Sequence, residues 1–435
     1  MNNTKTLVNI LNKSINKLKG KKEYLRNSET NFTRNRKLNF DKIINILMCM
    51  ESGSLKDELY NYFDLNINNP TSSALIQQRD KIKYEAFEWL LNDFNNQTRK
   101  NTLYKGYRLL AIDGSSLLIS YDKNDYDTYV PQGNQKGYNL FHINAMYDLL
   151  EHTYEDIIIQ NAVNLDENGA FNNIVDNYNG EKAIYIADRG YESYNSFAHV
   201  IESHQKFLIR VKDINSKTSL TRSLSLKDKT NEFDLMIERI LTTKQTNEIK
   251  KQPDKYKIVP KNQTFDYLNE HTLFYNIKFR VIRFKLDNDN YECIITNLSK
   301  EEFDVDEIKK LYNLRWGIET SFRELKYAVG LNSFHSKRRD FIKQEIFLRI
   351  LFYNFSERII RKIKPKKNRK NRKYVYQVNF TRAFHIIKKY LKKIKSGTEP
   401  PDIESIIEKE IEPIRFGRSS PRKVRNQTFV FFIYR

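Results

Sequence analysis

The sequence predicts an α/β protein in which a mixed sheet is flanked by helical segments at both ends of the chain. Between residues 107 and 211, short apolar runs alternate with stretches of helical apolar spacing, a pattern typical of strands and helices that build one sheet. Residues 1–100 and the residues beyond 348 show helical spacing instead. The aromatic content of 13% indicates a folded, globular chain.

The net charge is the most informative property of the composition. The 435 residues include 75 Lys and Arg against 54 Asp and Glu, which leaves a formal charge of +21 and a pI near 9.5. A surplus of this size favours a polyanionic partner, with nucleic acid ahead of an anionic membrane surface. A basic protein with evenly spread charge is the alternative, because composition does not locate the charge.

Cysteine usage and the length of the apolar runs predict a cytoplasmic, nucleoid-associated protein. Cys49 and Cys293 are the only cysteines and lie far apart, which fits a reducing compartment and excludes a disulfide framework and a CxxC zinc site. The N-terminus lacks the apolar segment of a signal peptide, and no apolar run approaches the length of a membrane span. No membrane partner is therefore expected.

Residues 1–100 are predicted to form a helical, DNA-binding head. Residues 39–62 have helical apolar spacing, and Pro70 and Thr71 begin a second helical run that continues to Leu91. Gln77, Gln78 and Arg79 on an exposed helix would be able to read base edges. These residues are also good helix formers, so a purely structural role is equally expected.

Residues 101–212 are predicted to be the first part of the core domain. Strands are expected at 107–112, 141–147, 156–160, 183–187 and 206–211, with helices near 167–178 and 193–203. Two early strands joined by a long loop, followed by alternating strands and helices, describe a mixed sheet.

Residues 213–289 break this alternation and are expected to form a mostly β insertion. It ends in a hairpin of strands 279–286 and 291–296. The core resumes at 290–347, and 348–435 are predicted to be a basic, helical C-terminal region. Residues 361–373 within it hold nine basic and no acidic residues, which suits a solvated arm or a strip that contacts phosphates.

The predicted helix over residues 311–329 has an unusual polar line. Tyr312, Arg315, Glu319 and Lys326 fall within an arc of roughly 60°, at about 100° per residue, beside an apolar stripe. Taken alone, these residues describe a solvated face with an Arg315–Glu319 pair at i,i+4. A carboxylate between cations at the border of a buried stripe also suits the wall of a cleft.

Two aspartates follow apolar strands, Asp113 after residues 109–112 and Asp188 after residues 183–187. Each alone has a simpler interpretation, with Asp113-Gly114 as a turn and Asp188 as a cap. A carboxylate at the end of a buried strand is also held in a crevice by a fixed backbone. With Glu319 these residues would supply hard oxygen ligands for two Mg²⁺ ions, or Mn²⁺ in their place. Two such ions support phosphodiester cleavage and strand transfer, which differ only in the nucleophile.

Other catalytic constellations have little support. The seven histidines show no HExxH or other zinc spacing, and the chain has no Walker A loop and no GxGxxG. His142, in an apolar strand, is expected to be a satisfied core residue. A tyrosine nucleophile of the recombinase type stays open because there are 27 tyrosines, although no Arg-His-Arg pattern supports it.

The spacing Tyr312-x2-Arg315-x3-Glu319-x6-Lys326 resembles the Y-R-E-K signature of DDE transposases of the bacterial IS-four family. Three further segments resemble that family's two aspartate motifs and its C-terminal pattern: Asp113-Gly114-Ser115, Asp188-Arg189-Gly190-Tyr191 and Arg418-x2-Pro421-Arg422-Lys423-Val424-Arg425. The likeness extends from about residue 105 to the end.

The resemblance implies a ribonuclease-H-like core, as in retroviral integrases, with a mostly β insertion before the glutamate. It implies Mg²⁺-dependent cut-and-paste transposition of an insertion sequence by a homodimer that holds two terminal inverted repeats of double-stranded DNA. By position, Asp113, Asp188 and Glu319 are then the catalytic metal ligands. The candidate DNA-binding residues are Tyr312, Arg315, Lys326, Arg189, Trp316, Arg422, Lys423 and Arg425.

The best-known family members cleave through a DNA hairpin, which requires an aromatic side chain to hold a base flipped out of the stack. In those relatives a Trp in the insertion does this, whereas the only tryptophans here are Trp89 and Trp316. Trp316, or an insertion aromatic such as Tyr256, is expected to substitute, with packing in the core as the alternative for Trp316. The alternatives are a non-transposing nuclease and a DNA-binding inhibitor or repressor, although a pure binder has no use for three clustered carboxylates.

Overall fold

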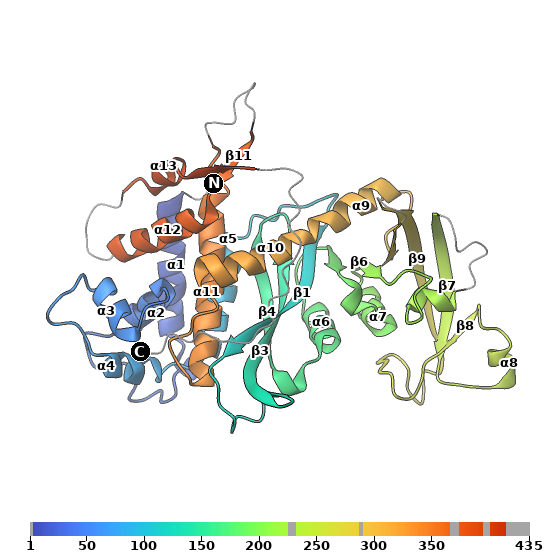
Figure 1. Cartoon of the computed structure of the whole chain (residues 1–435), viewed down its shortest axis with the longest axis horizontal. Coiled ribbons are helices and arrows are strands. Elements are labelled where there is room, and N and C mark those ends of the chain that lie inside the picture. The colour runs from blue at the N-terminus through green and yellow to red at the C-terminus, as the bar shows by residue number, and fades with distance from the viewer. Residues whose placement is uncertain (1–2, 225–231, 287–289, 366–373, 395–400, 415–435) are drawn as a thin grey trace.

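A ten-stranded mixed sheet lies at the centre of the computed structural model, which describes residues 3–224, 232–286, 290–365, 374–394 and 401–414. The strand order is β2-β3-β1-β5-β6-β10-β9-β7-β8, and β4 pairs with β3. Helices gather at one end of the sheet and on both of its faces (Figure 1). The predicted α/β class is confirmed.

The sheet region contains, in chain order, β1 (Arg108–Ile119), β2 (Tyr129–Gln132), β3 (Gln135–Asp148), β4 (Thr153–Asn161), α6 (Glu167–Asp176), β5 (Ala183–Ala187), α7 (Tyr194–Glu202), β6 (Lys206–Val211), β7 (Phe233–Thr242), α8 (Asn247–Lys250), β8 (Tyr256–Ile258), β9 (Tyr275–Lys285) and β10 (Tyr291–Thr296). The remaining elements are α1 (Thr4–Lys19), α2 (Phe40–Cys49), α3 (Leu55–Tyr62), α4 (Ser72–Arg79), α5 (Glu85–Thr98), α9 (Val305–Leu314), α10 (Trp316–Glu324), α11 (Arg339–Ile360), β11 (Tyr376–Val378), α12 (Phe380–Ile394), α13 (Ile403–Ile407) and β12 (Ile411–Pro413).

Five strands have the mixed arrangement expected of a ribonuclease-H-like core. β1, β5 and β6 are parallel neighbours, whereas β3 and β4 continue from β1 in antiparallel pairs. Strands β5, β6 and β10 have the predicted bounds, and β1, β3 and β4 are longer than predicted. Strand β1 continues well past its predicted end, because pairing with β3 carries it through a polar Gly-Ser-Ser segment that resembles a turn.

Alternation along β1 assigns its side chains to two different cores. Leu109 and Ala111 pack in a core with the helices α5, α10 and α11. Leu110 and Ile112 pack in a second core with α6 and α7. Because successive residues of a strand face opposite sides of the sheet, the next odd-numbered side chain faces the α10 side.

The helical head packs directly on the rest of the protein. Helix α11 packs against the head helices α2 and α5 and against β4, and α5 also contacts β4 directly. Apolar residues of the head and of this face of the sheet form one continuous core. The side chains of Gln78 and Arg79 are buried, with Arg79 only 1% exposed. The hypothesis of base reading is therefore wrong for Gln78 and Arg79. Gln77 is exposed, and its role stays a prediction.

The segment predicted as an insertion extends the core sheet. Strands β7 and β9 pair with each other and join the sheet through β10. Helix α11 begins at Arg339 and crosses the predicted boundary between residues 347 and 348. The domain limits 1–100, 101–212, 213–289, 290–347 and 348–435 stay a prediction.

The helix predicted over residues 311–329 is built from three parts, which corrects the expectation of one regular helix. Helix α9 ends at Leu314, α10 begins at Trp316, and a π-helical turn, Leu325–Val329, follows. Arg315 between them keeps α-helical dihedral angles, so α9 and α10 run nearly in line (Figure 1). The π turn ends at Gly330, whose φ of 95° is the left-handed conformation that glycine tolerates best.

Within the described parts of the chain, no helix is long and apolar enough to cross a membrane. The predicted basic block is described only up to residue 365, and Arg422, Lys423 and Arg425 lie outside the described residues.

Candidate active site

Asp113 and Asp188 lie at the same level of two neighbouring parallel strands. The pairing of β1 with β5 ends with Ala111 opposite Ile186, so each aspartate comes two residues after this last pair. Two residues along a strand return a side chain to the same face. Ala111 and Ile186 both pack in the core that includes α10, and both carboxylates therefore face α10.

Asp113 lies within β1 and not at its end, which corrects the prediction of a strand terminus followed by a turn. Residues 113–119 remain paired with β3 after β5 has ended. Asp113 Oδ1 accepts a hydrogen bond from the Gly114 N–H at 2.8 Å. The sheet thus fixes the backbone of Asp113 on one side while the carboxylate stays only half-buried.

Asp188 directly follows β5 and caps a short 3₁₀ turn, Arg189–Tyr191. Its Oδ1 accepts a hydrogen bond from the Gly190 N–H at 2.8 Å. The capping interpretation is confirmed, and because capping uses one carboxylate oxygen it leaves room for a second role. The neighbouring Arg189 side chain is exposed to solvent.

Glu319 is in the first turn of α10 and is held by Arg315. Arg315 Nη2 lies 2.9 Å from Glu319 Oε1, and the Arg315 side chain is 4% exposed against 25% for Glu319. The predicted i,i+4 pair therefore exists, but it is not a solvated surface pair. A nearly buried guanidinium instead turns the more exposed carboxylate toward one place.

The pKa of Asp113 indicates that the three carboxylates lie close to one another. Burial has the largest effect on the pKa of Asp113 and raises it, as does the charge of Asp188. The Gly114 N–H and Arg315 oppose this, Glu319 adds a smaller increase, and the resulting pKa is about 7. Charges shift a pKa in this way only from nearby. Asp113, Asp188 and Glu319 therefore converge on one region, although they come from two strands and a helix.

Lys326 and Tyr312 complete the polar line around Asp113. Lys326 Nζ donates to the Ser116 carbonyl at 2.9 Å, and burial lowers its pKa while Asp113 opposes that shift. Tyr312 is 3% exposed and lies beneath Arg315, whose guanidinium is 5.6 Å from the ring centroid. From this position Tyr312 supports Arg315 and has no free ring face for a base.

Trp316 is exposed on the face of α10 that adjoins Glu319. Its side chain is 52% exposed, and Arg315 lies 5.1 Å from the ring centroid. Trp316 lines a cleft of about 830 Å³ together with Arg323 and Arg361. The choice between core packing and an available aromatic surface is thus resolved in favour of the surface.

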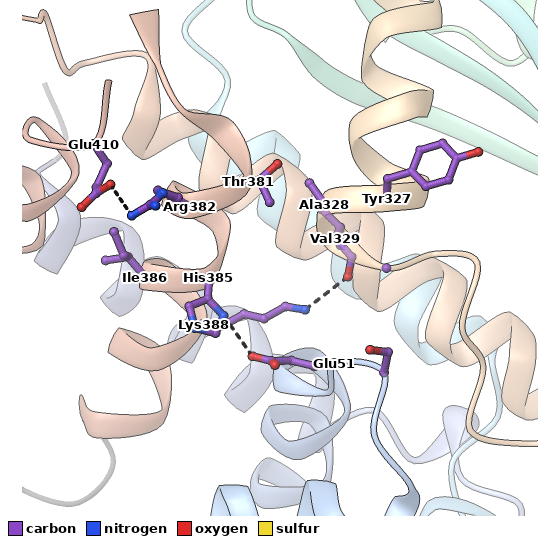
Figure 2. A pocket seen from close by; sticks show the side chains of 12 residues that line it. Glu51, Tyr327, Ala328, Val329, Thr381, Arg382, His385, Ile386, Lys388 and Glu410 are labelled. Carbon is purple, nitrogen blue, oxygen red and sulfur yellow. Dashed lines mark hydrogen bonds and ion pairs between the residues drawn. The ribbon is translucent and has the colours of Figure 1, made fainter. Parts of the chain in front are cut away.

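The π turn that follows α10 is fixed by buried cations. Figure 2 shows Lys388 of α12 extending toward the Val329 carbonyl at the end of the π turn. Lys388 Nζ lies 3.2 Å from that oxygen and 3.1 Å from the Met50 carbonyl of the head. Arg349 of α11 donates to Val329 and to the Gly330 carbonyl as well. The head and the C-terminal region thereby both hold the turn that carries Lys326.

The donor set fits Mg²⁺ or Mn²⁺ chemically. Carboxylate oxygens are the ligands that these ions prefer, and three mutually repelling carboxyl groups would be relieved by a divalent cation. Among the described residues, no three His, Cys, Asp or Glu side chains already have the arrangement of a metal site. Glu319 instead points its Oε1 to Arg315, so a metal ion would compete with that guanidinium.

A His–Glu pair beside the aspartates was not predicted from the sequence. His142 Nε2 lies 3.0 Å from Glu167 Oε1, and its Nδ1 lies 3.2 Å from Ser116 Oγ. His142 is 5% exposed, so its position in the core is confirmed. Its Nε2 is not fully satisfied, because it contacts Glu167 without a well-aligned hydrogen bond. No sequence pattern points to Glu167, because an acidic residue at the start of a helix is common for reasons of helix stability alone.

Comparisons with known proteins place the chain in a family. A model described as "Transposase DDE domain" matches residues 104–355, which is more than half of the chain. The chain belongs to the transposase DDE domain family. Among solved structures, a piggyBac transposase synaptic complex with hairpin DNA is similar at a TM-score of 0.46 and 11% identity, covering 97% of this chain and 87% of that chain. No curated protein matches the sequence.

The match to the DDE domain includes the whole candidate site. It begins before β1 and ends within α11, so Asp113, Asp188, Glu319 and Lys326 all lie inside it. The helical head lies outside the match, as does most of the C-terminal region.

Gly114 is expected to be important for stability in this DDE-domain protein, because no space is left there for a side chain. A Cβ there would lie 2.3 Å from His142 Nε2 and 2.7 Å from Glu167 Oε1, and the His142 ring is too buried to move freely. Gly114→Ala should therefore cost about 1–3 kcal/mol of unfolding free energy, measured by urea denaturation. Gly20→Ala is the matched control, because its Cβ would meet only one atom, at 3.4 Å. Equal stabilities for the two variants would contradict this explanation.

Proposed function

We propose that this protein is an insertion-sequence transposase of the IS-four type, which cleaves DNA at terminal inverted repeats and joins the ends to a target. The convergence of Asp113, Asp188 and Glu319 within a transposase DDE domain carries the proposal. A charge of +21 suits a protein that holds double-stranded DNA. Transposition would require two ends, so we expect a homodimer in the synaptic complex.

Each residue of the site has a different role in the proposed reaction. Asp113, Asp188 and Glu319 would hold Mg²⁺ or Mn²⁺, and such an ion would supply activation of the nucleophile and neutralisation of charge on the leaving oxygen. Arg315 orients Glu319 through its 2.9 Å contact. Lys326, half-buried beside Asp113, contributes positive charge next to the scissile phosphate. The exposed Arg189 would bind a phosphate of the same strand.

One experiment separates transposition from its alternatives. The purified protein is incubated with duplex DNA that carries its element's end and with Mg²⁺, beside Glu319→Gln and the exposed control Glu301→Gln. We expect wild type and Glu301→Gln to cleave and join the ends, and Glu319→Gln to bind without cleaving. Binding without cleavage by wild type would support the inhibitor or repressor, and cleavage of any DNA without joining would support a nuclease.

Trp316 is proposed to stack on a base of the cleaved end. Base–aromatic stacking typically contributes about 1–3 kcal/mol, so Trp316→Ala should slow end cleavage by roughly 5- to 150-fold, whereas Trp316→Phe should retain most activity. The other tryptophan supplies the control, because Trp89 is in α5 of the head and Trp89→Phe should leave cleavage unchanged. Full activity of Trp316→Ala would assign the stacking role to another aromatic, such as Tyr256.

A further inference from the structure

The helical head contains a cationic pocket that is separate from the carboxylates. Its volume is about 430 Å³, and it lies between the loop of residues 29–38 and the end of α4. Arg34, Arg36 and Lys81 line it, and Glu29 is the only acidic residue that does. The pocket therefore carries a surplus of positive charge.

The loop that forms this pocket is held in one conformation. Phe32 has a φ of 60°, a left-handed conformation that costs a non-glycine residue free energy unless packing enforces it. Its ring packs edge-on against Phe40, with centroids 5.4 Å apart, and Lys81 Nζ lies 5.6 Å from its centroid. The Asn27 side chain further accepts hydrogen bonds from two backbone N–H groups of the loop. The pocket thus exists before any ligand arrives.

The cations of the pocket lack an acidic counterpart. Within the described residues, no carboxylate lies within ion-pair distance, 4.0 Å, of Arg34, Arg36 or Lys81. Lys81 Nζ instead donates to the Gln78 amide oxygen at 3.0 Å. Burial lowers the pKa of Lys81, and repulsion from Arg36 lowers it further. An anion in the pocket would relieve both effects.

Phosphate is the anion that these groups fit best. Arg side chains bind phosphate oxygens through two parallel N–H groups and Lys adds a point charge. Thr30 and Thr33 also line the pocket. The Thr33 hydroxyl already donates to the Thr30 carbonyl, which leaves Thr30 as the neutral donor of the kind that commonly contacts the DNA backbone. We propose that this pocket binds one backbone phosphate of duplex DNA and so positions the head on the DNA independently of the catalytic carboxylates.

This inference rests on the proposed function only in that DNA is the partner. Its test measures binding without Mg²⁺, so cleavage plays no part. The affinity of the full-length protein for a short duplex is measured across salt concentrations for wild type, Arg34→Gln/Arg36→Gln and the exposed α1 control Lys13→Gln. Losing one phosphate contact should lower the slope of log affinity against log salt by about 0.9. The affinity should fall roughly tenfold, and equally for an end sequence and a scrambled duplex.

The possible outcomes separate the two proposals. An unchanged slope in the double variant, with wild-type binding intact, would overturn the phosphate pocket and leave the transposase proposal standing. Failure of wild type to bind any duplex at low salt would overturn both. An equal loss in Lys13→Gln would show that overall charge acts in place of this pocket. Recovery of the slope by Arg34→Lys/Arg36→Lys would support the pocket, since charge is kept and the loop is unchanged.

Discussion

Asp113→Asn is expected to abolish cleavage and, at the same time, to make the protein more stable at neutral pH. Burial and the nearby Asp188 raise the pKa of Asp113 to about 7, so its ionised form is costly in the folded state without a metal ion. Asparagine removes the charge and can keep the hydrogen bond from the Gly114 N–H. Cleavage should fall by more than about a hundredfold, because even outer-shell partners of a metal contribute 10- to 100-fold.

The raised pKa of Asp113 should make the folded protein less stable as the pH rises. Between about pH 4 and pH 7 the folded state keeps the proton on Asp113 while the unfolded state has lost it. Stability therefore decreases as the pH rises through this window, by up to about 1.4 kcal/mol per pH unit. Because Asp113 is only half-buried, solvent screening reduces the gain from Asp113→Asn to about 1–3 kcal/mol at pH 8.

Thermal unfolding with and without Mg²⁺ measures both effects. We expect Asp113→Asn to melt above wild type without Mg²⁺, and Mg²⁺ to stabilise wild type more than the variant, because binding favours ionised carboxylates. The exposed Asp127 provides the control Asp127→Asn, which should match wild type in both conditions. A lower melting temperature for Asp113→Asn, or equal stabilisation by Mg²⁺, would refute a strained carboxylate at this position.

The candidate site was largely predictable because its signals are local. Asp188 follows an apolar run that is buried on both faces of the sheet, and β5 has the predicted bounds. The spacing of Arg315 and Glu319 predicted their contact, since four residues bring two side chains together on a helix. Predicting that these residues lie close to Asp113 required the fold class as well. The alternation of predicted strands and helices indicated that class.

Long-range packing explains what could not be predicted. Asp113-Gly114 has the composition of a turn, yet pairing with β3 keeps it extended. The Glu167–His142 pair joins residues from a strand and a later helix, which no local pattern relates. Exposed-looking polar residues of α4 are buried because α11, more than 250 positions later in the chain, covers them. Tertiary contacts overrode local propensity in each of these places.

Breaking the buried network between the head and α11 should have the largest effect on stability. Arg79 of α4 lies 3.1 Å from Glu345 of α11, and each side chain is 1% exposed. Arg79 also donates to Gln344 and to the Phe341 carbonyl. Arg79→Met leaves Glu345 buried without its main partner from the head, so unfolding free energy should fall by about 3–5 kcal/mol.

A second variant and a surface pair make this prediction specific. Arg79→Met/Glu345→Gln removes both charges and should recover part of the loss in urea denaturation. Arg382, which pairs with Glu410 at 3.0 Å but is 68% exposed, supplies the control Arg382→Met, which should cost less than about 1 kcal/mol. Similar losses for Arg79→Met and Arg382→Met would contradict a buried network that holds the head.

The same network should give the protein a stability maximum in mildly acidic solution. Burial alone would lower the pKa of His335, but its hydrogen bond to Glu345 raises that pKa above its ordinary value. This contribution is complete below the ordinary histidine pKa, about 6.5, and is lost as the pH rises through the folded value. The pKa of Glu345 is held at about 2, against the effect of burial, by His335 and Arg79, so its contribution is lost only as the pH falls toward 2. His335→Gln should therefore flatten the alkaline side of the stability profile measured by urea denaturation. It should also move the acidic loss to higher pH, because His335 helps to hold the pKa of Glu345 low.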